Sequence, residues 1–147
     1  MLRTELIEKA LFDLINGALP TGVFRTVSRI GRIWSNVGPE NQPALFLIPN
    51  GGTVQQDQAF GIMKYVLGYD VLVYTRADEG SKTPPQTLFN DCWSAIDTAL
   101  RGTPSGFPQT LGGLVTNAWI EGQVLIDTGI LDEQCAVKIP IKVITGL

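Results

Sequence analysis

The clearest strand signal in the chain lies at residues 60–75, whose sequence is FGIMKYVLGYDVLVYT. Apolar and polar side chains alternate there, which is typical of a strand with one buried face. Lys64, Gly68 and Asp70 would occupy the polar face. The positions expected to face the core are Met63, Tyr65, Leu67, Tyr69, Val71 and Val73.

Two stretches have apolar residues at helical spacing. Residues 2–16 predict an amphipathic helix that ends at Asn16-Gly17. A second helix is expected after Thr83-Pro84-Pro85-Gln86, which has capping-box spacing and proline at the first helical position, and it would end at Gly102. Its apolar stripe, expected to be core, contains Leu88, Phe89, Cys92, Trp93, Ile96, Ala99 and Leu100.

The remaining strands are expected at residues 23–34, 44–48, 114–121, 123–127 and 135–145. In the last of these, Pro140 cannot donate a ladder hydrogen bond, which indicates an edge strand or a bulge. The order of helix, strands, helix and strands predicts an α+β fold, a mainly antiparallel β-sheet flanked by two amphipathic α-helices. A length of 147 residues fits a single domain over residues 1–147.

The charge balance excludes some classes of partner. The chain has 11 basic and 14 acidic residues, a net charge of −3, which disfavours a protein that grips nucleic acid through its phosphates. Residues 77–147 hold four of the basic and eight of the acidic residues. Acidic side chains within the first twenty residues argue against a secretory signal, and no apolar run has membrane-spanning length. We therefore expect a soluble protein made in the cytosol.

Residues suited to catalysis are few. The chain has no histidine, so the commonest general base and metal ligand is missing. No dinucleotide fingerprint, phosphate loop or EF-hand loop occurs. Cys92 and Cys135 lack CxxC spacing and are expected to be reduced thiols. The sequence predicts a binding or assembly subunit with no cofactor and no metal, and no enzyme.

One short motif keeps an enzyme open as an alternative. Asp127-Thr128-Gly129 follows an apolar run and resembles the active-site loop of retroviral-type aspartic proteases. In that family a small residue follows the glycine, whereas Ile130 follows here, and only 18 residues remain after Gly129. Asp-Thr-Gly is also ordinary turn chemistry between strands, and we favour that interpretation. An enzyme that binds a small molecule is a further alternative.

Several segments together resemble a known family. With the N-terminal helix they are Phe24-Arg25-Thr26-Val27-Ser28-Arg29, Gln42-Pro43-Ala44-Leu45-Phe46, Thr110-Leu111-Gly112-Gly113-Leu114-Val115, Ala118-Trp119-Ile120-Glu121-Gly122 and Ile139-Pro140-Ile141. In pattern and order, they are similar to the tail terminator (tail completion) proteins of long-tailed bacteriophages. The resemblance covers nearly the whole chain but includes no catalytic signature.

The resemblance implies a structural role in the virion, at the junction of head and tail. Such a subunit forms a homo-oligomeric ring, usually a hexamer, that caps the tail-tube protein, ends tube growth and offers a docking face to the head-completion or connector protein. DNA would pass through the lumen without specific binding, which suits an acidic surface. Another phage structural subunit, a tail-tube or head-closure protein, is the main alternative; a tube protein would form long filaments alone.

Candidate interface residues follow from this expectation. A ring needs two different complementary patches on each subunit. One patch would contain Arg25, Arg29 and Arg32, with Trp34 and Trp119 as further interface candidates, and acidic residues of the second half would supply the other. A solvated edge strand protected by charge is the alternative. Loops at residues 50–58 and 76–82 are expected to order on a partner, through Asn50, Gly51, Gly52, Gln55, Gln56, Asp57, Asp78, Glu79 and Lys82.

Overall fold

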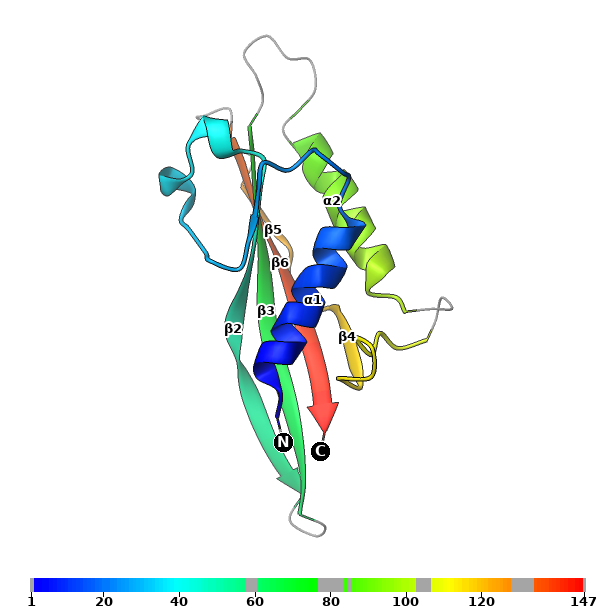
Figure 1. The fold of residues 1–147 in the computed structure, drawn as a ribbon. Coiled ribbons are helices and arrows are strands. Elements are labelled where there is room, and N and C mark those ends of the chain that lie inside the picture. The colour runs from blue at the N-terminus through cyan, green and yellow to red at the C-terminus, as the bar shows by residue number, and fades with distance from the viewer. Residues whose placement is uncertain are drawn as a thin grey trace.

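The computed structural model of the chain describes residues 2–57, 61–76, 84, 86–102, 107–127 and 134–146. Its two α-helices and one six-stranded, mostly antiparallel sheet confirm the α+β fold (Figure 1). The helices are α1 (Thr4–Ala18) and α2 (Gln86–Ala99), and the strands are β1 (Thr26–Ser28), β2 (Ala44–Asp57), β3 (Ile62–Arg76), β4 (Asn117–Ile120), β5 (Leu125–Asp127) and β6 (Gln134–Gly146).

The sheet has the strand order β1-β2-β3-β6-β4, and β5 also pairs with β6. Among the described strand pairs, β1–β2 is parallel and the others are antiparallel. One row of partners crosses five strands at a single level, from β1 at one edge to β5 at the other; it consists of Val27, Leu45, Val73, Val137 and Ile126.

Both helices cover the same face of the sheet, and the main core lies between them and the strands (Figure 1). The apolar stripes predicted from the sequence point inward here, because burying each large side chain contributes about 1.5–3 kcal/mol. The fully buried residues include Ile7, Leu11 and Ile15 of α1, Phe89, Cys92 and Ile96 of α2, and Leu47, Val71, Val73 and Ile139 of the sheet.

A smaller cluster covers part of the opposite face. There the segment between β1 and β2 folds back, and its Val37 packs with Phe46 and Tyr74 of the sheet. The ring of Tyr74 lies 5.7 Å from that of Phe46. Further along this face Asp70 is buried, accepts a 3.4 Å hydrogen bond from Asn50 and lies 3.7 Å from the Lys138 ammonium.

The strand predicted at residues 23–34 is shorter than expected. Only Thr26–Ser28 is a strand, and Trp34 begins a short 3-10 helix, Trp34–Asn36, rather than ending a strand. The hydroxyl of Ser28 accepts a 3.0 Å hydrogen bond from the backbone N–H of Ile30, which turns the chain out of the strand.

The loop predicted at residues 50–58 is wrong over its described part. Asn50, Gly51, Gly52, Gln55, Gln56 and Asp57 all lie in β2, which pairs with β3 as far as Asp57. The glycines form a register shift between Pro49 and Gly52, with Gly51 at φ +88°, so they make a bulge instead of a turn. Of the second predicted loop only Arg76, the end of β3, is described, and Asp78, Glu79 and Lys82 lie outside the described residues.

The edge position proposed for Pro140 is also wrong, because β6 lies between β3 and the pair β4 and β5. The Pro140 carbonyl accepts a 3.2 Å hydrogen bond from the N–H of Glu121, which follows β4. The missing N–H of Pro140 therefore faces the interruption between β4 and β5, where no regular ladder needs it. Pro140 also lies opposite Asp70 in an unbroken register with β3, so that pair has no bulge at this residue either.

Candidate protein-protein interface

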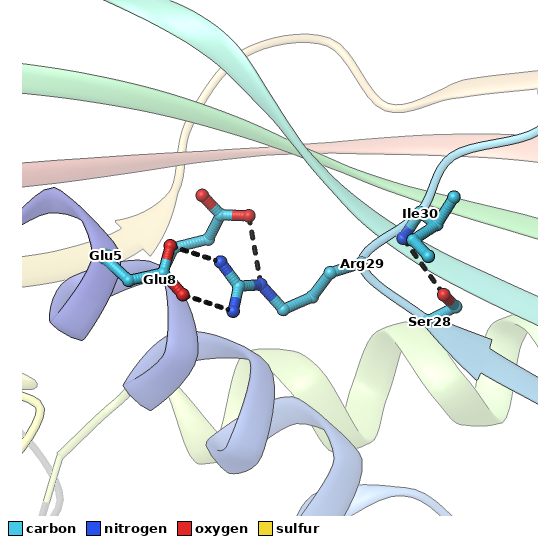
Figure 2. A network of polar contacts seen from close by, with 5 residues as sticks. All are labelled: Glu5, Glu8, Ser28, Arg29 and Ile30. Atoms are coloured by element: carbon cyan, nitrogen blue, oxygen red, sulfur yellow. Dashed lines mark hydrogen bonds and ion pairs between the residues drawn. The ribbon is translucent and has the colours of Figure 1, made fainter.

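Residues 29–43 form a loop that projects beside the sheet at its β1–β2 edge (Figure 1). Arg29 ties the start of this loop to α1. Its two terminal nitrogens donate to the Glu5 carboxylate at 2.8 and 2.9 Å, and its Nε donates to Glu8 at 3.1 Å (Figure 2). A two-pronged contact between guanidinium and carboxylate fixes direction as well as distance, so the side chain holds one geometry.

The charges in this contact change each other's protonation. Hydrogen bonds from Arg29 and its positive charge lower the pKa of Glu5 below the ordinary 4.5. The hydrogen bonds to Glu5 and Glu8 raise the pKa of Arg29. Nearby, burial and then the charge of Glu8 raise the pKa of Tyr69 to about 12. The shifts of Glu5 and Arg29 favour the charged form of the pair, whereas that of Tyr69 keeps its hydroxyl protonated.

We expect Arg29→Met to lower stability at neutral pH and to lose that effect in acid. Because the pKa of Glu5 is lower in the folded state, its contribution is present above pH 4.5 and disappears as the pH falls through the lowered value. Melting temperatures of variant and wild type should therefore converge as the pH falls below the lowered pKa of Glu5. The exposed pair of Arg101 and Asp97 on α2 gives a matched control, Arg101→Met, for which a smaller difference is expected. An Arg29→Met difference that persists unchanged at pH 3 would contradict this account.

Further contacts hold the rest of the loop. The Tyr74 hydroxyl donates a 2.8 Å hydrogen bond to the backbone carbonyl of Arg32. Gly31 lies so close to β2 that an added Cβ would come within 2.8 Å of Ile48. The backbone is thus fixed, yet the side chains of Ile30 and Ile33 are 75% and 63% exposed. Large apolar side chains that are exposed to solvent on an ordered backbone are typical of a protein contact site.

A second exposed apolar pair lies at the opposite edge of the sheet. Leu125 and Ile126 of β5 are 46% and 47% exposed, and β5 pairs with β6 along one side. Asp127 is the last residue of this strand, whereas Thr128 and Gly129 of the Asp-Thr-Gly motif lie outside the described residues. This edge is the second candidate contact surface.

The far half of the β2–β3 hairpin forms a third surface. Beyond Leu47 no residue of β2 belongs to the buried core, and the hairpin continues past the end of α1 (Figure 1). Residues 44–56 carry no charge, and Val54 is an exposed apolar side chain in this run. Among the described strands, β1 pairs with the outer side of β2, and only as far as Phe46. An uncharged strand edge without a pairing strand can accept another protein chain.

The predicted interface residues lie in different parts of the structure and differ in their contacts. Arg25 donates a 3.2 Å hydrogen bond to the Glu40 carbonyl, and Arg29 binds α1, so both have partners within the chain, while Arg32 is exposed. Trp119 is half-buried in β4, at the sheet edge opposite β1. The exposed Ile30, Ile33, Leu125 and Ile126 were not singled out, because in sequence they resemble inward positions of strands.

Two kinds of site are not found in the described part of the chain. No group of three or more Cys, Asp or Glu side chains there could hold a metal ion. Neither α1 nor α2 has the length and apolarity that a membrane-spanning helix needs. Both cysteines are buried free thiols.

No protein-family model matches the sequence, and no curated protein matches it.

Proposed function

We propose that the chain is a structural subunit of a long-tailed bacteriophage that forms a ring on the end of the tail tube. In this role it ends polymerisation of the tail-tube protein and offers a docking surface to the head connector, at the junction of head and tail. DNA passes through the ring without specific binding. The proposal assigns the exposed side chains to contacts between proteins and none to catalysis.

The observation that carries the proposal is the projecting β2–β3 hairpin. Among its described side chains, β2 contributes none to the buried core beyond Leu47, bears the exposed Val54 and carries no charge from residue 44 to 56. A tube cap must bind a neighbouring protein ring through a surface that is not needed for its own fold. The hairpin meets that requirement, and the segments that resemble tail terminator proteins support the same role.

Electron microscopy of mixtures tests the proposal directly. Purified chain added to polymerising tail-tube protein should give short tubes with a cap of extra density, whereas tubes without it continue to grow. The chain alone should form closed particles of one size. Unchanged tube lengths would contradict the proposal, and long filaments of the chain alone would indicate a tail-tube protein instead.

We expect Val54→Asp to weaken binding to tube ends by about tenfold or more, because it places a charge in an apolar contact. Stability should hardly change, since Val54 is exposed. The matched control is Thr53→Asp, an equal charge on the other face of the same strand, which should bind within about threefold of wild type. Co-sedimentation with tubes measures both. Equal losses for the two variants would show that Val54 is not a contact.

A further inference from the structure

We infer that the bound partner adds a strand to the outer edge of β2, along Gly52 to Gln56, and so extends the sheet of this chain. The added strand is an extended segment of the tail-tube protein with apolar side chains at alternate positions. The identity of the partner rests on the proposed function, whereas the pairing rests on β2 itself: its free edge, the direction of its backbone groups and the side chains beside them.

The outer edge of β2, on the side away from β3, is open beyond the pairing with β1. That pairing ends at Ser28↔Phe46, and from there on β2 pairs, among the described strands, with β3 alone. Gly31 still lies close to β2, since a Cβ added to it would come within 2.8 Å of Ile48. From residue 49 to residue 56 every residue is exposed, and this part of the hairpin extends past the end of α1 (Figure 1). A neighbouring chain can therefore reach the distal edge.

The pairing with β1 shows which backbone groups of β2 point outward. In a strand the N–H and C=O groups of successive residues point alternately to the two sides. The N–H of Thr26 donates to the carbonyl of Pro43, and Val27 lies opposite Leu45. Pro43 and Leu45 therefore point toward β1, the outer side, and the residues between and after them alternate from there.

This alternation can be carried past the bulge through β3. Leu45 lies opposite Val73, and Gly52 lies opposite Leu67, an even number of residues along β3, whose register with β6 is unbroken between them. Gly52 therefore points outward as Leu45 does. Two and four residues further on, the N–H groups of Val54 and Gln56 point outward as well, free to bond an added strand.

Two features close the edge before Gly52. Pro49 is an outward position by the same alternation, and it has no N–H to donate. The register shift between Pro49 and Gly52, with Gly51 at φ +88°, then interrupts the strand. Prolines and bulges at a sheet edge prevent pairing with other chains. The open regular stretch thus begins at Gly52, and only the distal part of β2 can accept a strand.

The side chains of this stretch select the added strand. Val54 lies opposite Tyr65, on the face of the sheet where Leu67 packs against the main core. Val54 is 57% exposed and Tyr65 is half-buried. An added strand places a side chain of its own beside Val54, and an apolar one there removes apolar area from water. On the other face Thr53 and Gln55 are polar, so the intervening side chains of the added strand can be polar too.

The short length of the open stretch favours a partner that makes further contacts. Strand addition gives affinity through main-chain hydrogen bonds, but a stable contact between two proteins takes about 20–30 residues on each side. Two copies of this chain joined only along Gly52 to Gln56 would fall far short of that. The end of a tube offers a whole protein surface, of which the added strand is one part.

Proline substitutions test the direction of the backbone groups. Gln56→Pro removes an N–H that points outward, so the melting temperature should change by no more than about 2 °C. Gln55→Pro removes an N–H that points toward β3 and should lower the melting temperature by about 5 °C or more. Circular dichroism measures both. An equal drop for the two variants would overturn the inference, because Gln56 would then not point outward.

Binding to tube ends tests the added strand. Gln56→Pro should bind at least about tenfold more weakly than Gln56→Thr, because both lose the side-chain amide but only the proline variant loses the backbone donor. Co-sedimentation with tubes measures the ratio. In hydrogen exchange, the N–H groups of Val54 and Gln56 should exchange at least about tenfold more slowly on capped tubes than in the free chain.

The outcomes separate this inference from the proposed function. A wild type that caps tubes, with Gln56→Pro and Gln56→Thr binding equally well, overturns the inference and leaves the function intact. A wild type that leaves tube growth unchanged overturns the function, and with it the tube protein as the source of the strand. If the same N–H groups become protected in the chain alone as its concentration rises, a second copy occupies the edge, which also overturns the inference.

Discussion

Replacing Phe89 by alanine is expected to lower the free energy of unfolding by about 3–5 kcal/mol. The Phe89 side chain is 0% exposed and belongs to the core between α2 and the sheet. Removing most of the ring leaves a cavity, because the surrounding side chains can relax only partly. A domain of this kind is stable by only about 5–15 kcal/mol, so the variant would lose a large part of its stability.

Urea unfolding followed by circular dichroism measures this loss, with Trp93→Ala as the control. Trp93 stacks on Phe89 with ring centroids 5.8 Å apart, but it is 36% exposed. Its replacement should cost clearly less than that of Phe89, although tryptophan is the larger residue. Equal costs, or a cost below about 1 kcal/mol for Phe89→Ala, would show that the core is not packed as described.

The Cys92 thiol of the folded protein is expected to react with thiol reagents at least a thousandfold more slowly than that of the unfolded chain. Burial raises the pKa of Cys92 from its ordinary 9.0 to about 12. Only the thiolate reacts, so near neutral pH the reactive fraction falls by about a thousandfold. The side chain is also fully buried, which keeps reagents away.

Reaction with a chromophoric disulfide reagent at pH 8, with and without urea, tests this expectation. Burial also raises the pKa of Cys135, so both thiols should react slowly before unfolding and quickly after it. Because Phe89 and Cys92 lie in one core cluster, Phe89→Ala should speed the labelling of Cys92 by making opening more frequent. Rapid labelling of the wild-type thiols in the absence of urea would contradict a core that excludes the reagent.

The two helices and β3 are confirmed predictions, because each has a periodic apolar pattern that burial on one face enforces. The spacing of Ile7, Leu11 and Ile15 is sufficient to orient α1 toward the sheet. The pattern could not place Trp93, which belongs to the apolar stripe of α2 but reaches its exposed margin. Periodicity gives the direction of a side chain, whereas its burial depends on which elements lie opposite.

The second half of β2 could not be predicted from local sequence. Asn50-Gly51-Gly52 has the composition of a turn, and the residues after it are polar. They are a strand because β3 supplies hydrogen-bond partners along its whole length, with the glycines absorbed in a bulge. The pairing with β3, from Gly52↔Leu67 to Asp57↔Ile62, therefore overrides the local preference.

The candidate interface was only partly foreseen, for a similar reason. Arg29 was singled out for its charge, but its partners Glu5 and Glu8 precede it by 24 and 21 residues, and no local pattern connects them. Ile30 and Ile33 have the composition of strand residues. Only the folded loop shows that their side chains face solvent while their backbone is fixed.

The order in which the chain leaves the ribosome gives the two edges a common property. The loop is anchored through Glu5 and Glu8, so it takes its final form only after α1 has docked. Strand β5 is held by β6, the last strand to be synthesised. Neither the loop nor β5 therefore reaches its final form before α1 has docked and β6 has paired.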